Sequence, residues 1–269
     1  MNTIVERYKK IKSNILLLKP TMPVNIIAVS KTFSLSHIQP LIDYGHNHFG
    51  ENKVQEATSK WSNINKEEKK INLHMIGKLQ SNKAKEAVKI FDYIHSLDSQ
   101  KLADILAKAQ KNENKNLKYF IQVNIGNEIQ KSGIPIEHLD AFYNYCSKEL
   151  KLNILGLMAI PPNDKNAKKY FKYLNELNKS LALSDLSMGM SEDYLGAVAN
   201  EAKFVRIGSS IFGSRFYEIF TFVFFLIFLS SLINSIFFIA TQPSVLLYPF
   251  FAICINIALP LFFFTGFIL

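Results

Sequence analysis

One lysine stands directly after a nearly continuous apolar run. Residues 24–30 read VNIIAVS, and Lys31 follows them. At the end of a buried strand a lysine amine is partly removed from water, which favours its neutral form and lowers its pKa. A neutral amine can attack an aldehyde and form an imine, whereas an ammonium cannot. The position therefore predicts a nucleophilic lysine, and the alternative is a strand-end lysine that reaches solvent.

Small residues and one arginine lie in or next to two later apolar runs, residues 185–189 and 204–208. In barrels of parallel strands, phosphate sites recur after the seventh and eighth strands, where backbone N–H groups point at the anion. Small side chains let the backbone approach an anion closely, and those suited to the task are Ser187, Gly189, Ser191, Gly208 and Ser209. Arg206 lies inside one apolar run and needs a buried partner, such as a ring nitrogen or a carboxylate. The pattern predicts an anion site, although glycine–serine pairs also occur in ordinary turns.

These residues need elements that bring them to one place. Short apolar runs alternate with amphipathic stretches of helical length, which is typical of parallel βαβ units. We predict strands over residues 24–30, 48–50, 73–77, 93–97, 119–125, 154–159, 185–189 and 204–208. We predict helices over residues 2–18, 36–44, 52–60, 83–89, 100–111, 136–150, 167–182 and 194–201.

The number of predicted strands indicates an α/β fold of the (β/α)8 or TIM-barrel type, covering residues 1–215. In such a barrel the active site lies at the C-terminal ends of the strands. A doubly wound open sheet is the alternative architecture. No Gly-rich dinucleotide fingerprint follows any of the predicted strands, which weakens that alternative.

The charged residues stop abruptly near residue 216. From Phe216 to Leu269 the only charged residue is Glu218, so the first 215 residues hold 31 basic and 21 acidic side chains, a formal charge of +10. The basic residues are scattered among acids, with no recognition-helix or stacking-aromatic motif. We therefore expect a solvated basic surface and no nucleic-acid partner.

Neither the cysteines nor the histidines show the spacing of a metal site. Cys146 and Cys254 are far apart, and the six histidines suggest no metal site. His46 and His48 alternate, but no nearby cysteine or acid pair completes a ligand set with them. No metal is expected. The N-terminus has no apolar core of signal-peptide length, which favours a cytoplasmic barrel in a reduced compartment.

Residues 216–269 form an apolar tail with one or two candidate transmembrane helices. Residues 219–240 are 22 uncharged residues, and a helix of that length spans about 33 Å, enough to cross a bilayer. Residues 245–269 are a second candidate, interrupted by Pro249 and Pro260. Lys203, Arg206 and Arg215 precede the first span, so the barrel would stay in the cytoplasm, tethered to the inner membrane. Read-through or a frameshift in an AT-rich gene is the alternative explanation of the tail.

Eight sequence blocks, in order along residues 1–215, are similar to the motifs of one family. They are residues 28–32 (AVSKT), 49–52 (FGEN), 74–83 (HMIGKLQSNK), 94–98 (IHSLD), 122–134 (QVNI and KSGI), 156–161 (GLMAIP), 186–191 (LSMGMS) and 205–213 (VRIG and IFG). Together they resemble the pyridoxal phosphate homeostasis proteins, single-domain relatives of the alanine racemase N-terminal barrel.

The resemblance implies a cofactor, pyridoxal 5'-phosphate, and a role for each matched position. Lys31 would carry the cofactor as a Schiff base, Arg206 would face its pyridine nitrogen, and Asn52 would lie beside the ring. The residues implied at the phosphate are Ser187, Gly208 and Ser209, with backbone help around Met188 and Gly189. The family ends near residue 215, so the tail is a departure from its pattern.

The chemistry of Arg206 favours a carrier over an enzyme. A carboxylate opposite the ring nitrogen would keep that nitrogen protonated and make the ring a strong electron sink. An arginine cannot accept that proton, and the sequence after residue 215 is apolar, with Glu218 as its one charged residue. The resemblance accordingly implies a non-catalytic regulator of pyridoxal phosphate, with dependent apoenzymes as candidate partners. Two alternatives stay open: a minimal racemase using Lys83 or Lys131 as base, and a membrane-tethered scaffold.

Overall fold

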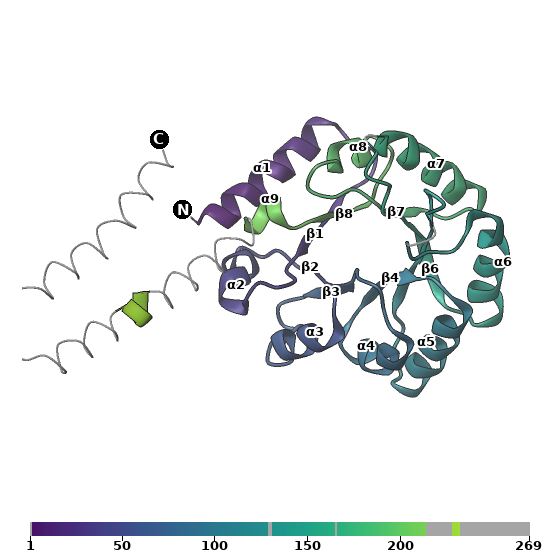
Figure 1. Cartoon of the computed structure of the whole chain (residues 1–269), viewed down its shortest axis with the longest axis horizontal. Coiled ribbons are helices and arrows are strands. Elements are labelled where there is room, and N and C mark those ends of the chain that lie inside the picture. The colour runs from purple at the N-terminus through teal and green to yellow at the C-terminus, as the bar shows by residue number, and fades with distance from the viewer. Residues whose placement is uncertain (1, 129–130, 165, 214–227, 232–269) are drawn as a thin grey trace, which may run out of the picture. The chain divides into compact units, whose positions relative to one another are not determined.

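Eight parallel strands close into a barrel in the order in which they occur along the chain (Figure 1). The computed structural model describes residues 2–128, 131–164, 166–213 and 228–231. The strands are β1 (Asn25–Val29), β2 (His48–Glu51), β3 (Asn72–Met75), β4 (Tyr93–Leu97), β5 (Lys118–Gln122), β6 (Asn153–Met158), β7 (Asp185–Ser187) and β8 (Phe204–Ile207). The predicted (β/α)8 barrel is confirmed.

The barrel closes where β8 pairs with β1. Their parallel register joins Ala28 to Ile207 and Ile27 to Arg206. All four residues of β8 are buried, as are the last four of β1. Strands covered on both faces read as continuous apolar runs, which explains why they stand out in the sequence. Lys31 and Gly208, each just beyond one of these strands, therefore follow neighbouring strands at the same end of the barrel.

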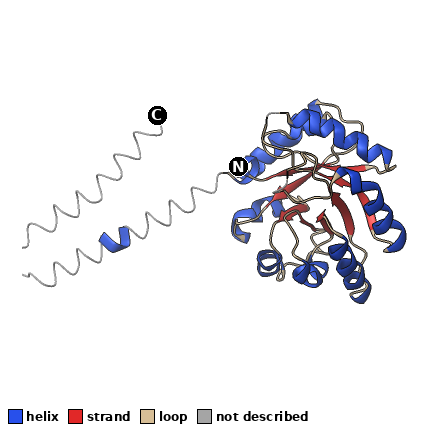
Figure 2. Cartoon of the chain, turned by 45° about the vertical axis from the view of Figure 1, so that its right-hand side comes forward, coloured by secondary structure: helices blue, strands red, loops and turns tan. Residues whose placement is uncertain are grey.

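Helices cover the outside of the barrel, and the strands lie within them (Figure 2). They are α1 (Thr3–Leu17), α2 (Leu35–Asp43), α3 (Val54–Trp61), α4 (Ala84–Ile90), α5 (Gln100–Asn112), α6 (Leu139–Asn144), α7 (Ala167–Ser180), α8 (Tyr194–Val198) and α9 (Ser209–Phe212). Two short 3-10 turns, η1 (Ser81–Lys83) and η2 (Ile136–His138), precede α4 and α6. Apolar residues at helical spacing bury one face of these helices against the strands.

The first helix shows how the sequence pattern places an element. Asn2 caps α1, because its Oδ1 accepts the backbone N–H of Ile4 at 3.0 Å. Ile4, Tyr8, Ile11 and Ile15 are its buried residues. Their spacing of three to four positions puts them on one face of the helix.

Several predicted elements differ from the structure in their bounds; for example, the strand predicted over residues 119–125 is Lys118–Gln122, and the helix predicted over residues 194–201 is Tyr194–Val198. The helix predicted over residues 136–150 consists of η2, α6 and a π-helical turn, η3 (Tyr145–Glu149). In that turn the N–H of Leu150 donates to the carbonyl of Tyr145, five residues back, at 3.1 Å. The strand predicted over residues 185–189 ends at Ser187, because Gly189 has a φ of +87° and turns the chain away from the sheet.

The barrel interior is filled with side chains, several of them polar. Ile27, Tyr93, Phe120, Met158 and Phe204 form an apolar cluster there. His74 stacks on Tyr93 with ring centroids 4.2 Å apart, and His95 stacks on Phe120 at 4.4 Å. Arg206 is also buried. Buried polar groups need hydrogen-bond partners, so their arrangement constrains the interior.

The apolar tail falls almost wholly outside the described residues. The predicted spans over residues 219–240 and 245–269 lie outside them, apart from the helical residues 228–231. Within the described ranges, no helix is long and apolar enough to cross a membrane. The part of the chain up to Gly213 forms one compact unit, and the predicted boundary after Arg215 stays a prediction.

Candidate functional site

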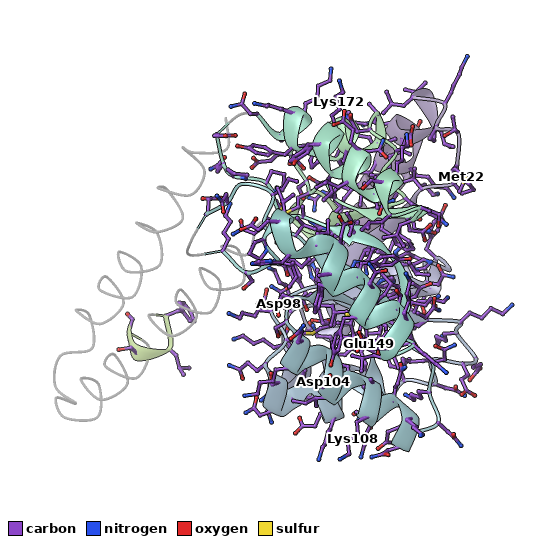
Figure 3. All side chains as sticks on the ribbon, turned by 90° about the vertical axis from the view of Figure 1, so that its right-hand side faces the viewer. Met22, Asp98, Asp104, Lys108, Glu149 and Lys172 are labelled. Atoms are coloured by element: carbon purple, nitrogen blue, oxygen red, sulfur yellow. The ribbon has the colours of Figure 1, made fainter. Side chains whose placement is uncertain are left out.

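The predicted site residues come from strand ends that meet at one mouth of the barrel. Lys31 follows β1, Asn52 follows β2, and Gly208 follows β8. A Cβ built on Gly208 would lie 3.3 Å from the Cβ of Val29, so the ends of β1 and β8 touch. In Figure 3, Met22, which precedes β1, lies at the right-hand end of the barrel, and Asp98, which follows β4, lies toward the other. The candidate site belongs to the end at which the strands finish.

The peptide groups on both sides of Lys31 are held by side chains of β2 and α3. Ser30 is fully buried, and its hydroxyl donates to Oε1 of Glu51 at 2.8 Å. The Lys60 ammonium donates to the carbonyl of Ser30 at 2.8 Å. On the other side, the backbone N–H of Thr32 donates to the carboxylate of Glu56. Three polar side chains, Glu51, Glu56 and Lys60, thus form a clamp around the Lys31 loop.

An ion pair stabilises this clamp below the surface. Lys60 lies 2.9 Å from Oε1 of Glu51, with the two side chains 8% and 0% exposed. Trp61 donates its indole N–H to the same oxygen at 3.1 Å. Burial raises the pKa of Glu51, while the Lys60 charge and the hydrogen bonds from Lys60, Trp61 and Ser30 lower it. The second carboxylate oxygen is buried with no hydrogen-bond partner among the described residues.

The Lys31 loop also stores backbone strain. Thr32 has a φ of 68°, in the left-handed region that a β-branched residue seldom adopts. Such a conformation persists only where surrounding contacts hold it. The hydrogen bond from its N–H to Glu56 is one of those contacts. The clamp therefore fixes an otherwise unfavourable backbone path next to Lys31.

A turn of small residues lies on the β8 side of the mouth. The hydroxyl of Ser209 donates to that of Ser191 at 3.2 Å, and the N–H of Ser210 points to the Ser191 oxygen at 3.5 Å. Gly189 shapes the chain before it, because a Cβ there would meet the Ala197 Cβ at 2.5 Å. The structure thus brings together Ser191 and Ser209, two of the small residues that the sequence predicts for an anion site.

Ser187 lies inside the barrel, where its hydroxyl is already engaged. It is fully buried, accepts a hydrogen bond from Arg206 at 2.8 Å, and lies 2.8 Å from Nδ1 of His95. Met188 is also buried, and its backbone N–H donates to the carbonyl of Phe204 at 3.1 Å. A phosphate role for Ser187 and Met188 stays a prediction, and both groups would have to leave these partners to serve it.

Arg206 is a buried cation held by oxygen atoms. Its Nη1 donates to the carbonyl of Ser187 at 2.7 Å, and its Nη2 donates to the carbonyl of Ala159 at 2.9 Å. Burial lowers the pKa of Arg206 to about 10, and the charge of Asp193 opposes that effect. Within the described barrel, no carboxylate forms an ion pair with the guanidinium. The predicted need for a buried partner is met on the Nη side by these oxygens.

Asn52 lines a cavity of about 440 Å³ beside this mouth. The cavity lies between the segment after β2 and the segment after β3, and its lining includes Met75, Gly77, Lys78 and Lys83. A Cβ on Gly77 would come within 2.5 Å of the Asn52 carbonyl oxygen, so these two segments pack directly against each other. A place for Asn52 beside a cofactor ring stays a prediction.

The two lysines considered as alternative bases are both paired. Lys83 lies 3.1 Å from Glu86, and Lys131 contacts Glu128 and donates to the carbonyl of Pro161 at 3.2 Å. Among the described residues, no group of three or more histidine, cysteine or acidic side chains could hold a metal ion.

Sequence reasoning missed the clamp around Lys31. Glu51 ends the apolar run of β2, and Lys60 and Trp61 end the next helix. A carboxylate at the end of a buried strand was an available signal, because a buried acid needs a partner. The partner could not be named from spacing alone, since it depends on how α3 packs on β2.

Comparisons with known proteins match the same part of the chain. Residues 7–216 match the family described as alanine racemase, N-terminal domain. The pyridoxal phosphate homeostasis protein of Aquifex aeolicus is 36% identical over 201 residues, covering 71% of this chain and 87% of that protein. The protein of the same name from Escherichia coli K12 is 35% identical over 204 residues, covering 72% of this chain and 87% of its own length.

Solved structures agree with this match. PipY of Synechococcus elongatus with pyridoxal phosphate bound is 34% identical and superposes with a TM-score of 0.67, covering 78% of this chain and all of that one. The alanine racemase of Bartonella henselae is 14% identical with a TM-score of 0.61, covering 79% of this chain and 60% of the racemase. That second likeness shows the fold alone.

Proposed function

The chain belongs to the pyridoxal phosphate homeostasis proteins, which share the alanine racemase N-terminal domain, and on that premise we propose that it binds pyridoxal 5'-phosphate and takes part in its intracellular homeostasis. Its relative PipY has been solved with pyridoxal phosphate bound. The observation in this chain that carries the proposal is the clamped loop of Lys31, next to a turn of small residues on the neighbouring strand.

The residues at the mouth fit such a group. The Lys31 amine would bind the aldehyde carbon of the cofactor. The clamp fixes the peptide groups on both sides of this residue and so holds the amine in place. Gly208 and Ser209, with Ser191, would hold the phosphate through hydroxyl and backbone N–H groups. When bound, pyridoxal phosphate supplies an aldehyde conjugated to an electron-withdrawing ring.

Arg206 and Asn52 would set the orientation of the ring. Two nitrogens of Arg206 are occupied by Ser187 and Ala159. Its Nε–H, which none of the described residues accepts, would donate to an unprotonated ring nitrogen. Asn52 lies at the cavity wall and would contact the ring edge. In this arrangement Ser187 supports Arg206, while Met188 and Gly189 shape the turn that leads to Ser191.

We infer that the protein holds the cofactor without turning over amino acids. A guanidinium cannot protonate or deprotonate a ring nitrogen at neutral pH, because its pKa stays far above that range. The candidate bases Lys83 and Lys131 are charged partners of Glu86 and Glu128. A base at either position would first have to leave its acidic partner.

The absorbance of the purified full chain tests the binding proposal. We expect a band from a lysine-bound pyridoxal phosphate that borohydride abolishes. Lys31→Ala should lose the band, whereas Lys172→Ala should keep it. Lys172 lies on the outer helix α7, with 75% of its side chain exposed (Figure 3). An unchanged band in Lys31→Ala would show that another lysine carries the group.

Exchange of the α-hydrogen of alanine or serine in deuterated water separates the carrier from the racemase. The carrier proposal expects exchange no faster than that with free pyridoxal phosphate. Exchange at enzymatic rates, lost in Lys83→Ala or Lys131→Ala, would instead support the minimal racemase. Transfer to pyridoxal-phosphate-dependent apoenzymes can be followed by their activation with loaded protein in the presence of a trap for free cofactor.

The tail allows a separate proposal about location. We propose that residues 219–240 tether the barrel to the inner membrane, on the basis of their 22 uncharged residues and the basic residues before them. Full-length protein should fractionate with membranes, and a chain ending at residue 215 should not. A native protein whose mass corresponds to an end near residue 215 would support a read-through or frameshift origin of the tail. A membrane fraction with no bound cofactor would favour the scaffold alternative.

A further inference from the structure

Three histidines and a serine form one continuous hydrogen-bonded chain through the barrel. Nδ1 of His48 lies 2.9 Å from Nε2 of His74, and Nδ1 of His74 lies 2.9 Å from Nε2 of His95. Nδ1 of His95 lies 2.8 Å from the hydroxyl of Ser187, which accepts from Arg206 at 2.8 Å. We call His48, His74, His95 and Ser187 the histidine ladder. The ladder begins at His48, the first residue of β2, and ends at Ser187, which contacts the guanidinium of Arg206.

Arg206 fixes the direction of hydrogen bonding along the ladder. A guanidinium only donates, so the Ser187 oxygen must be the acceptor of that bond. Among the described residues, Nδ1 of His95 is the one remaining partner for the Ser187 hydroxyl hydrogen. The serine therefore donates to His95, because a buried hydroxyl hydrogen without an acceptor is costly.

The direction then passes from ring to ring. A neutral imidazole carries one N–H, so a histidine that accepts at Nδ1 must donate from Nε2. His95 accepts at Nδ1 and donates from Nε2 to Nδ1 of His74, which in turn donates from Nε2 to Nδ1 of His48. All three rings are consequently the same tautomer, protonated at Nε2.

The surroundings keep the two inner histidines, His74 and His95, neutral and out of contact with solvent. Burial lowers the pKa of His74 and His95 well below the ordinary histidine value, and for His95 the charge of Arg206 adds to that effect. The stacked rings of Tyr93 and Phe120 cover one face of each imidazole. A second proton on either ring would place two donors against each other and break the chain.

This polarity solves the problem of a buried cation without a counter-ion. Each imidazole of the ladder turns its unprotonated nitrogen toward Arg206 and its N–H away from it. The aligned dipoles present their negative ends to the guanidinium, as the solvent would. Arg206 is only 4% exposed and has no carboxylate partner among the described residues. The ladder thus takes the place of a counter-ion, which would compete with a ligand for the Nε–H of Arg206.

We propose that the histidine ladder is a one-directional chain of hydrogen bonds that keeps Arg206 charged and oriented toward the bound ring, so that His48, His74 and His95 are positioning residues for the ring-nitrogen contact. The contact with the ring rests on the proposed function, whereas the direction of the ladder does not. An acid in place of the ladder would pair with Arg206 directly. A chain of neutral rings fixes its Nη side and leaves its Nε edge for the ligand.

The tautomers can be read without any cofactor. Long-range ¹H–¹⁵N correlation spectra of the full chain, with cofactor removed, distinguish a protonated from an unprotonated ring nitrogen. We expect Nε2–H for His48, His74 and His95 alike. A proton on Nδ1 of His95, or a mixture of tautomers along the ladder, would overturn the proposed direction.

Substitutions at His74 test what the ladder does for Arg206. His74→Gln can still accept from His95 and donate to His48, whereas His74→Phe can do neither. We expect His74→Phe to bind pyridoxal phosphate roughly tenfold more weakly, the effect of about one buried hydrogen bond, with a shifted absorbance maximum. His74→Gln should recover most of both. Ile27→Val, in the same interior cluster and outside the ladder, is the matched control for packing.

The outcomes separate this inference from the proposed function. If His74→Phe changes affinity and absorbance no more than Ile27→Val does, or if His74→Gln fails as badly as His74→Phe, the positioning role is overturned. If the wild-type chain takes up no pyridoxal phosphate but its histidines show the expected tautomers, the proposed function fails and the direction of the ladder stands.

Discussion

Replacing Lys60 by methionine should destabilise the loop that carries Lys31. Methionine keeps most of the length of the side chain but cannot donate to Ser30, Glu51 or Glu56, as the ammonium does at 2.8, 2.9 and 3.1 Å. The carboxylate of Glu51 would then stay buried without its counter-charge. Removing one partner of a buried ion pair costs about 3–5 kcal/mol of unfolding free energy.

The raised pKa of Glu51 limits this cost. Burial already shifts that carboxyl toward its neutral form, and each pKa unit corresponds to about 1.4 kcal/mol. An unpaired Glu51 can therefore take up a proton in place of remaining charged. We expect a loss near the lower bound, about 3 kcal/mol at neutral pH, together with slower attachment of pyridoxal phosphate to Lys31.

The pH dependence of this loss follows from the same carboxyl. Without Lys60 the pKa of Glu51 rises further in the folded state, so the folded chain binds more protons than the unfolded chain above the ordinary glutamate pKa. The unfolding free energy of Lys60→Met should therefore recover, relative to wild type, as the pH falls from about 7 to about 5. That contribution is lost again as the pH rises through the folded pKa.

Denaturant titrations with a double-mutant cycle measure these effects. Glu51→Gln combined with Lys60→Met should cost less than the sum of the two single changes, by about 1–3 kcal/mol, because the buried charge is gone. Lys89→Met is the control, since Lys89 is 63% exposed and 3.5 Å from Glu113, and such surface pairs contribute less than about 1 kcal/mol. A Lys60→Met loss no larger than that of Lys89→Met, or strictly additive changes, would refute the clamp.

Three further changes test other parts of the site. Gly189→Ala should lose about 2 kcal/mol of unfolding free energy, because the φ of Gly189 is +87° and the new Cβ would lie 2.5 Å from the Cβ of Ala197. A loss of only a few tenths of a kcal/mol in denaturant titrations would contradict this packing. Gly77→Ala should displace Asn52, because the carbonyl oxygen of Asn52 would be 2.5 Å from the new Cβ. We expect pyridoxal phosphate binding to weaken roughly tenfold, while borohydride still traps the cofactor on Lys31. An unchanged dissociation constant would argue against Asn52 beside the ring. Burial lowers the pKa of His46 from 6.5 to about 4. As the pH falls from 6.5 to about 4, His46 is protonated in the unfolded chain before it is protonated in the folded chain, so the unfolding free energy falls by about 3 kcal/mol. His46→Gln should reduce the slope of that dependence between about pH 7 and pH 5, and equal slopes for the two proteins would count against the buried neutral His46.

The barrel was readable from the sequence because most strand residues are buried. Residues 24–30 and 204–208 read as nearly unbroken apolar runs, and they form the adjacent strands β1 and β8. Element ends were less accurate. Gly189 could not be recognised as the residue that turns the chain away after β7 has ended at Ser187, because glycine also occurs inside strands, as Gly50 and Gly156 do.

The site was predictable in part. Lys31 and Gly208 could be placed at one mouth, since parallel strands all finish at the same end of a barrel. The orientation of Ser187 could not, because the last residue of a strand can face the interior or the surface turn. The partners of Glu51 and Arg206 depend on packing between elements distant in sequence, which no local pattern encodes.

The attachment point of pyridoxal phosphate tests the account most directly. The full chain, loaded with pyridoxal phosphate and reduced with borohydride, can be digested and its peptides weighed by mass spectrometry. We predict a pyridoxyl group on Lys31 and unmodified Lys60, Lys83 and Lys131. Modification spread over several surface lysines, or confined to a lysine other than Lys31, would contradict it.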